Sequence, residues 1–313
     1  MNKTIRYALL GISAVILTFA LVYLLFPGIF IERSVAIARW QAGLETHYQQ
    51  VGQHRWPYLE GGTEHGETIV FIHGFSSKKE YWIGMMEHFA GQYHVITPDI
   101  PGFGDNKIIE GADYRIPAQV DRLNRFLEAM EVNAFHIAGC SMGGWIAGYY
   151  ASEHPEKVLS LALIDSAGVI SAETSQAHKH LKKTGENLLV PSDAEGYKKM
   201  MAVVFHDPPP IPDRLAEAFI EQRMQRLDSE KIMFRALRQS QKDNLEERLH
   251  LIQAKTLIIW GGEDQIIDIS AMRILHRGIK QSQTAVLEKV GHAPHLEALD
   301  KTANTYRQFL DTI

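Results

Sequence analysis

Cysteine is almost absent from this chain of 313 residues, in which Cys140 is the only one. A single thiol excludes an intrachain disulfide framework and any zinc or iron–sulfur site that needs several cysteines. It does not decide the cellular compartment, because secreted proteins need not contain disulfides.

Concentrated charge of either sign is also missing. The formal net charge is -5 and the sequence pI is near 6.3, and the chain has neither a basic stretch nor an acidic tail. A protein that binds nucleic acid needs a basic face for the phosphates, so we expect no nucleic acid partner. The hydrophobic fraction of 45% is that of an ordinary globular chain with a buried core.

Charge is wholly absent from the segment Tyr7–Phe30, "YALLGISAVILTFALVYLLFPGIF". As a helix rising 1.5 Å per residue, it can cross a hydrocarbon layer of about 30 Å. A signal peptide has a shorter apolar region that ends at a small-residue cleavage site, whereas this run ends in "LLFPGIF". We therefore predict an uncut, single-pass membrane anchor. Lys3 and Arg6 before the span balance Arg33 and Arg39 after it, so the side of the membrane stays open.

The segment after the anchor, "ERSVAIARWQAGLETHYQQ", has apolar residues at helical spacing. Val35, Ala38, Ala42 and Leu44 would share one face, which predicts a helix over residues 32–50. Two roles stay open for it. The helix either lies in the membrane interface with its apolar side on lipid, or packs against the domain that follows.

Short apolar runs then alternate with longer amphipathic stretches. Such runs are typical of a parallel sheet covered by helices on both sides, and they occur at 68–72, 93–97, 134–138, 159–164, 256–260 and 284–288. Between the runs at 93–97 and 134–138, the segment "IPAQVDRLNRFLEAMEV" places five apolar residues on one helical face: Val120, Leu123, Phe126, Leu127 and Met130. The pattern predicts an α/β fold with a mostly parallel central sheet flanked by helices.

The alternation stops between residues 168 and 250, where the chain is polar, helix-prone and interrupted by "HDPPPIPD". We predict that this cap segment is a helical insertion over the carboxyl edge of the sheet, where open α/β folds bind their ligands. The predicted organisation is an N-terminal membrane anchor (1–31), a first part of the α/β core (32–167), the cap segment (168–250) and a second part of the core (251–313).

The stretch "AFHIAGCSMGGWIAG" places Ser141 between a predicted strand and a predicted helix. Gly139-Cys140-Ser141-Met142-Gly143 matches the G-x-S-x-G nucleophile elbow in the strand–turn–helix setting that this motif requires. A turn this sharp brings the strand and the helix so close that side chains at the two glycines would collide. The alternative is a packing turn that only needs small residues.

A serine hydroxyl is a weak nucleophile and needs a base, an orienting acid and donors for the oxyanion. Asp264 in "WGGEDQIID" and His292 in "VGHAPHLE" each follow a predicted strand, in the order Ser, Asp, His. In "FIHGF", the Phe75 amide would point to the same edge as the Met142 amide. We predict a catalytic triad of Ser141, Asp264 and His292 and an oxyanion hole of Phe75 and Met142.

Several residues near these motifs have alternative roles. Asp165 ends a predicted strand and is an alternative acid. His295 follows His292 by three positions, but the chain has no H-E-x-x-H motif and no third clustered ligand, so we expect no metal. We expect Cys140 to be a packing residue, His73 a structural turn residue and Asp99 an organiser of the loop beside the oxyanion hole.

Together, "HGFSSKKEYW", "DIPGFGDN", "AGCSMGGWIAG", "WGGEDQIID" and "VGHAPHLE" carry a family resemblance. From about residue 30 onward, the chain resembles the membrane-anchored monoacylglycerol lipases of the α/β-hydrolase superfamily and the related bacterial lipases and esterases. The resemblance implies the α/β-hydrolase fold and the same triad and oxyanion residues. One departure is Asn106, which stands where a serine often follows D-x-P-G-x-G.

The motifs and the resemblance imply a serine hydrolase that cleaves carboxylic esters through an acyl-enzyme, without a cofactor. Its expected substrates are acylglycerols or similar lipid esters. Met200, Met201 and Phe205 are candidate acyl-chain contacts, because flexible thioethers suit chains of variable shape, although they would serve equally to pack the cap segment onto the core. The alternatives are a thioesterase, an amidase or a carbon–carbon bond hydrolase with the same triad, or a non-catalytic membrane-tethered binding module. The oligomeric state is not predicted.

Overall fold

An eight-stranded sheet forms the centre of the structure, a computed structural model that describes residues 3–313. The strands lie in the order β1-β2-β4-β3-β5-β6-β7-β8, and all pairs from β4 to β8 are parallel, whereas β1 and β2 pair antiparallel. Their bounds are β1 Leu44–Val51, β2 His54–Gly62, β3 Thr68–Ile72, β4 His94–Pro98, β5 Phe135–Cys140, β6 Val158–Ile164, β7 Lys255–Gly261 and β8 Ser282–Leu287. The predicted α/β fold with a mostly parallel sheet is confirmed.

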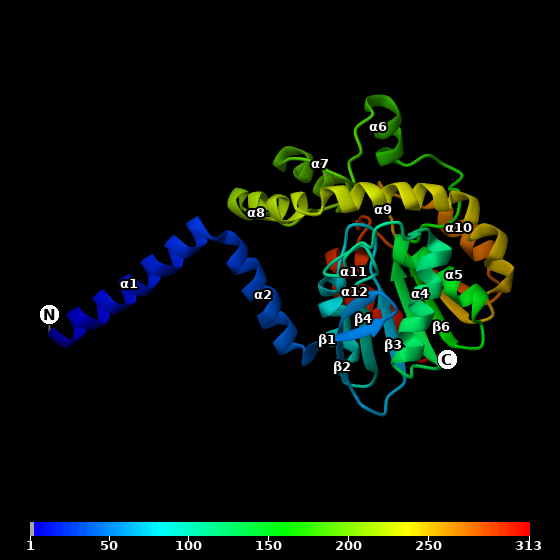
Figure 1. The fold of residues 1–313 in the computed structure, drawn as a ribbon, viewed down its shortest axis with the longest axis horizontal. Helices are drawn as coiled ribbons and strands as arrows, with labels where there is room; N and C mark the ends of the chain where they lie inside the picture. The colour runs from blue at the N-terminus through cyan, green and yellow to red at the C-terminus, as the bar shows by residue number, and fades with distance from the viewer. Residues whose placement is uncertain (1–2) are drawn as a thin grey trace.

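Helices cover both faces of the sheet (Figure 1). One face carries α4, α5 and α10 in a single apolar cluster, and the other carries α3 and α12 in a second. The helices of the main body are α3 Ile83–Phe89, α4 Ile116–Ala129, α5 Met142–Glu153, α10 Ser270–Gly278, α11 Pro294–Glu297 and α12 Leu299–Leu310, with a 3₁₀ turn η1 at Lys79–Trp82. Because both faces are covered, most side chains of the inner strands are buried, and most of these are apolar.

Strand β3 illustrates how the alternation of side chains serves both layers. Val70 and Ile72 belong to the cluster under α4 and α5, whereas Ile69 and Phe71 belong to the cluster under α3 and α12. Successive side chains of a strand point to opposite faces, so this strand supplies apolar groups to both. All four side chains are fully buried.

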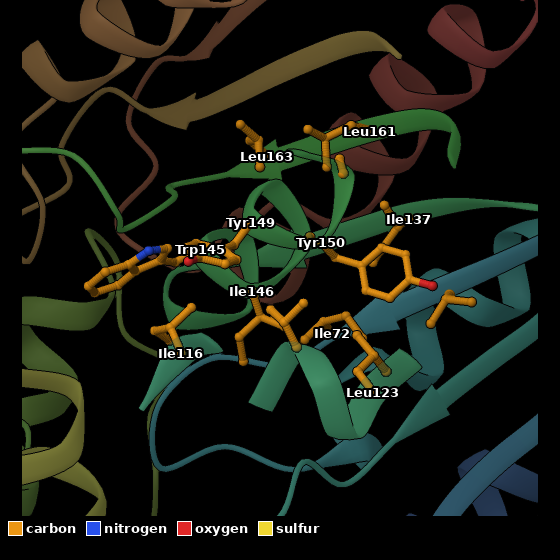
Figure 2. Close-up of a cluster of buried hydrophobic side chains, with 14 of the residues drawn as sticks. Ile72, Ile116, Leu123, Ile137, Trp145, Ile146, Tyr149, Tyr150, Leu161 and Leu163 are labelled. Atoms are coloured by element: carbon orange, nitrogen blue, oxygen red, sulfur yellow. The ribbon is translucent and has the colours of Figure 1, made fainter. Parts of the chain in front are cut away.

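Helix α5 lies at the centre of the first cluster (Figure 2). Every residue of it except Glu153 is buried. On one side of Ile146 and Tyr150 lie side chains of the sheet, such as Leu161. On the other side lies Leu123 of α4. The helix that follows Ser141 is thus held on several sides, which fixes the position of its first turn.

The predicted helix over residues 32–50 is wrong in its second half. Helix α2 spans Pro27–Gln41, Gly43 takes the left-handed conformation with φ 65°, and Leu44–Val51 is strand β1. Glycine at this φ ends a helix without a steric penalty. The apolar residues on either side of Gly43 therefore share the same core cluster but belong to different elements.

Helix α1 (Lys3–Leu25) projects away from the main body, and α2 connects it to the sheet (Figure 1). The stretch Ile5–Leu25 has a mean hydropathy of 2.5 and none of its most apolar window is buried, so it is long and apolar enough to cross a membrane. Helix α2 packs against α8 and β1. Its Val35 and Ala38 contact the core, while Ile37 and Trp40 are exposed.

The cap segment contains four α-helices and lies beside one edge of the sheet (Figure 1). These are α6 Gln176–Thr184, α7 Ala194–Val204, α8 Asp213–Met224 and α9 Leu227–Gln239, followed by two 3₁₀ turns, η2 at Ser240–Asp243 and η3 at Glu246–Leu251. Helices α7 and α8 share a small apolar cluster, whereas Met233 and Ala236 of α9 join the core cluster beneath α4 and α5.

Candidate active site

Ser141 lies at a sharp turn between β5 and α5. Its backbone has φ 57° and ψ -120°, a combination that L-residues rarely adopt. The turn is held by hydrogen bonds on both sides: the Ser141 amide donates to Ile164 O at 3.0 Å, and Ser141 O accepts from the amides of Trp145 and Ala167. Strain of this kind persists only where the surroundings over-determine the conformation.

The two flanking glycines leave no room for a side chain. A Cβ at Gly139 would lie 2.2 Å from Gly143 O, and a Cβ at Gly143 would lie 2.1 Å from Ile72 O. Both contacts are with backbone atoms, which cannot rotate away. Close approach of β5, α5 and β3 therefore explains the glycines at these positions.

His292 and Asp264 meet at the same edge of the sheet, in the loops after β8 and β7. Nδ1 of His292 is 2.8 Å from Oδ2 of Asp264, whose side chain is fully buried. The other oxygen, Oδ1, accepts hydrogen bonds from the amides of Ile266 and Ile267 at 2.7 and 3.0 Å. The amide of His292 donates to Val204 O of α7 at 2.7 Å. The carboxylate is thus fixed, and it orients the imidazole.

The loop after β3 passes directly beside Ser141. A Cβ built on Gly74 would lie 3.3 Å from Ser141 Cβ and 3.9 Å from its Oγ. The next residue is Phe75, and Met142 is the first residue of α5. Among the hydrogen bonds that residues 3–313 form outside helices and strands, none uses the amide of Phe75 or Met142 as donor. Both amides next to Ser141 are therefore available to an oxyanion.

His73 ties this loop to its neighbour after β4. Its Nε2 accepts a hydrogen bond from the Ile100 amide at 3.0 Å, and its Nδ1 donates to Gly74 O at 2.8 Å. This pairing requires the neutral ring with its proton on Nδ1. Complete burial lowers the pKa of His73 to about 4, so the ring stays neutral at ordinary pH.

Asp99 organises the same neighbouring loop. Its carboxylate accepts from the amide and the ammonium of Lys79 at 2.8 and 2.7 Å and from the Asp105 amide at 2.8 Å. Asn106, which replaces the common serine, donates from Nδ2 to Asp99 O at 2.9 Å, and its Oδ1 lies 3.2 Å from Nδ1 of His54. Asparagine therefore supplies the loop with a hydrogen bond of its own.

A cavity of about 290 Å³ opens above Ser141 and His292. The sequence-predicted contacts Met200, Met201 and Phe205 all line it. Sequence reasoning missed most of its other walls, which are largely aromatic or aliphatic: Tyr81, Leu189, Tyr197, Ile211, Phe219, Ile266 and Leu296. Because these residues come from the cap segment and three separate loops, no local pattern in the sequence groups them.

Arg223 of α8 is the charged residue in this lining, and sequence reasoning also missed it. Its side chain is 9% exposed and forms an ion pair of 2.9 Å with Glu230 of α9. The guanidinium also donates to Leu189 O. These bonds direct its charge toward the protein, so the cavity above Ser141 stays mainly apolar.

Asp165 lies close to Asp264 but has a different partner. Its Oδ1 accepts from the Gly261 amide at 2.9 Å, whereas the imidazole of His292 bonds to Asp264. Burial, reinforced by the charge of Asp264, raises the pKa of Asp165 well above its ordinary value. The structure thus gives the two acids different partners: Asp165 bonds to a backbone amide, and Asp264 bonds to the imidazole of His292.

Potential metal-ligand atoms of Asp165, Asp264 and His292 lie within 4.8 Å of one another. Both oxygens of Asp264 are already hydrogen-bonded and Nδ1 of His292 is engaged with one of them, so we assign no metal to this cluster. The ring of His295 stacks on Trp82 with centroids 4.4 Å apart. Burial and the nearby His292 lower the pKa of His295 to about 3.

Cys140, next to Ser141, belongs to the core cluster beneath α3 and α12. Its side chain is buried, and its Sγ donates a weak hydrogen bond to His292 O at 3.7 Å. Burial raises the pKa of this thiol well above its ordinary value. The residue is therefore a packing group beneath the turn.

Comparison with known proteins agrees with this geometry. A family model described as the alpha/beta hydrolase fold matches residues 67–299. The chain belongs to this family. The elbow, the loop order and the inserted helices of this α/β hydrolase are all contained in the matched region, and the resemblance expected from the sequence is confirmed.

Several relatives of this α/β hydrolase match most of its length. It is 36% identical to lipase 1 of Psychrobacter immobilis over 256 residues, which are 80% of this chain and 79% of that protein. It is 30% identical to monoacylglycerol lipase abhd6-A of Xenopus laevis over 308 residues, 95% of this chain and 91% of that protein. The crystal structure of a membrane phospholipase A, a bacterial virulence factor, superposes with a TM-score of 0.88 at 36% identity and covers 98% of both chains.

Proposed function

We propose that this α/β hydrolase cleaves carboxylic esters of lipids, with Ser141 as nucleophile, His292 as base and Asp264 as the orienting acid. The observation that carries the proposal is the cavity. A serine at a strained elbow and a histidine bonded to a buried carboxylate line the same mainly apolar space. An ester carbonyl at Ser141 would have its acyl chain among the apolar walls.

In the proposed reaction, His292 takes the proton of Ser141 as Oγ attacks the ester carbonyl, and Asp264 stabilises the imidazolium that forms. The tetrahedral intermediate collapses when His292 returns the proton to the departing alcohol. Water, activated by the same histidine, then attacks the acyl-enzyme and releases the fatty acid. The hydrogen bonds from two amides to Asp264 keep its charge in place throughout.

The amides of Phe75 and Met142 are the proposed donors to the oxyanion. Met142 begins α5, so its N–H adds the positive end of a helix dipole. Fixed donors of this kind stabilise charge that develops only in the transition state, and removing one costs about 10²–10³ in rate in a comparable enzyme.

The apolar cavity and the relatives support a lipid as substrate. Met200, Met201 and Phe205 are the proposed acyl-chain contacts, because they line the cavity and combine flexible thioethers with an aromatic ring. The relatives named above are a lipase and a monoacylglycerol lipase, and the superposed structure is a phospholipase. We assign lipid acyl esters as the class, with acylglycerols as the first substrates to test.

Helix α1 is the proposed single-pass anchor, and α2 is the proposed interfacial helix. Ile37 and Trp40 are exposed on the same helix whose Val35 and Ala38 contact the core. A helix that packs on the protein with one side and exposes tryptophan on another suits the boundary between lipid and water. Anchoring would place the cavity near water-insoluble esters.

The decisive experiment combines active-site labelling with a substrate panel. The purified full chain should react with a fluorophosphonate probe, and Ser141→Ala should not, whereas the control Ser171→Ala should label like the wild type. Monoacylglycerol, a phospholipid, a thioester and an amide are then compared by kcat/KM. Absence of labelling would favour a non-catalytic binding module. A preference for the thioester or the amide would reassign the substrate class, and sensitivity to a chelator would restore the metal alternative.

A further inference from the structure

Helix α9 of the cap segment lies against the loop that supplies the proposed oxyanion donor. Ser76 Oγ donates a hydrogen bond of 2.6 Å to Oε1 of Glu230, a residue 154 positions later in the chain. Glu230 is 4% exposed. A charge-assisted hydrogen bond this short and this buried links the two segments firmly.

Ser76 is held in an unusual backbone conformation. Its φ is 56°, in the left-handed region that non-glycine residues rarely occupy. Such a residue relaxes to an ordinary conformation unless its surroundings prevent it. The hydrogen bond to Glu230 is the side-chain contact that opposes this relaxation. Because Ser76 follows Phe75 directly, a change at Ser76 turns the Phe75 backbone as well.

Glu230 is itself fixed from α8. Oε2 of Glu230 lies 2.9 Å from the guanidinium of Arg223, which also donates to Leu189 O. Burial raises the pKa of Glu230, and both Arg223 and Ser76 counteract that rise by stabilising the carboxylate. The carboxylate is therefore a rigid acceptor, set by two helices of the cap segment.

The side chain of Phe75 is clamped by the same helix. Its ring makes an edge contact with Phe234, one helical turn after Glu230, at a centroid distance of 5.7 Å, and with Phe103 at 5.6 Å. Residues four apart on a helix share a face, so one face of α9 holds both Phe75 and Ser76.

We propose that Glu230 is a positioning residue for the oxyanion hole: through Ser76, it keeps the Phe75 amide directed at the carbonyl that Ser141 attacks. The inference rests on the proposed function and adds a role for the cap segment. The cap then does more than enclose the acyl chain, because it completes the site that stabilises the transition state. Loss of the Ser76–Glu230 bond should lower kcat without weakening substrate binding.

Kinetics of Glu230→Ala and Ser76→Ala on a soluble butyrate ester test the proposal. Each should lower kcat by about tenfold to a hundredfold, the range expected for a displaced oxyanion donor, while KM changes by less than about threefold. The double variant should be no worse than the single ones, because both changes remove the same contact. Glu230→Gln keeps an acceptor oxygen and should retain most of kcat, and Lys231→Ala, an exposed change on the same helix, should behave like the wild type.

Deuterium exchange gives a second readout that does not need turnover. The amides of residues 74–78 should exchange faster in Ser76→Ala and Glu230→Ala, and at the wild-type rate in Glu230→Gln. If Glu230→Ala fails to fold, Ser76→Ala removes the same bond from the other side. Unchanged exchange and unchanged kcat in Ser76→Ala would overturn the inference. A wild-type chain that neither labels with fluorophosphonate nor cleaves any ester would instead refute the proposed function. The exchange rates would still show whether the Ser76–Glu230 bond holds residues 74–78 in place.

Discussion

Acidification from pH 7 to pH 5 should destabilise the folded protein through His73. Burial lowers the pKa of this residue from 6.5 to about 4, and its Nε2 accepts a hydrogen bond that a protonated ring could not accept. Between these two pKa values, the unfolded chain therefore binds a proton at His73 that the folded chain does not bind. Stability is retained above pH 6.5 and falls as the pH drops toward 4.

The size of this effect follows from the two pKa values. At pH 5, protonation of the unfolded chain at this one residue lowers the free energy of unfolding by about 2 kcal/mol relative to pH 7. The result depends little on the folded pKa, provided that it lies well below 5. His295, whose pKa is about 3, should contribute a similar amount. As the pH falls from 6 to 4.5, each of these two histidines lowers the free energy of unfolding, with a slope against pH of up to about 1.4 kcal/mol per pH unit.

Urea denaturation of the full chain in detergent micelles, followed by tryptophan fluorescence at several pH values, measures this slope. His73→Gln keeps hydrogen-bonding groups but does not titrate. The free energy of unfolding of this variant should therefore depend less steeply on pH, by the contribution of the one proton that His73 binds. His65→Gln is the matched control, because that side chain is exposed. Buried carboxyl groups with raised pKa, such as Glu230, act in the opposite direction, so the difference between variant and wild type isolates His73. Equal slopes in the wild type and His73→Gln would refute the reasoning.

Three further predictions concern the proposed chemistry and anchoring. Ser141→Ala and His292→Ala should each lower kcat by about 10⁴-fold with the fold intact, and the double variant should be little worse; multiplied losses would contradict a unit that acts together. Asp264→Asn should lower kcat by about 10³–10⁴, whereas Asp165→Asn, which bonds to a backbone amide and not to His292, should cost less than about tenfold. A reversed ranking in that assay would reassign the acid. A chain shortened to begin at Phe26 should keep its kcat on a soluble butyrate ester and lose most of its rate on monoacylglycerol in vesicles, and equal losses on both would make α1 a structural element.

The inner part of the sheet could be predicted because burial on two faces leaves a simple signal. All six predicted strands exist, with ends shifted by two residues at most; five are inner strands, and the sixth, β8, is an edge strand whose residues 285–287 are still apolar. Strands β1 and β2 gave no such signal. β1 is an edge strand with the polar sequence "LETHYQQV", and β2 contains Pro57, so neither forms an apolar run. Their pairing depends on contacts across the sheet, which a reading along the chain does not reveal.

The candidate site, too, could be predicted from the sequence only in part. The carboxyl ends of parallel strands meet at one edge, so the loops with Ser141, Asp264 and His292 were expected to converge, and the structure places them together; their catalytic roles remain predictions. The linkage from Arg223 through Glu230 to Ser76 could not be anticipated. It joins residues from two cap helices to a loop more than 140 positions earlier, and the sequence around each one reads as an ordinary polar surface.

Because the thiol of Cys140 is buried, we expect the folded chain to behave toward thiol reagents like a chain without cysteine. Because the Cys140 side chain is buried and burial raises the pKa of its thiol, we expect it to react poorly with maleimide reagents. A cysteine introduced in place of Asp228, whose side chain is 96% exposed on α9, would therefore be the sole reactive position. Treating intact cells with an impermeant maleimide would then report on which side of the membrane the proposed anchor α1 places the catalytic region.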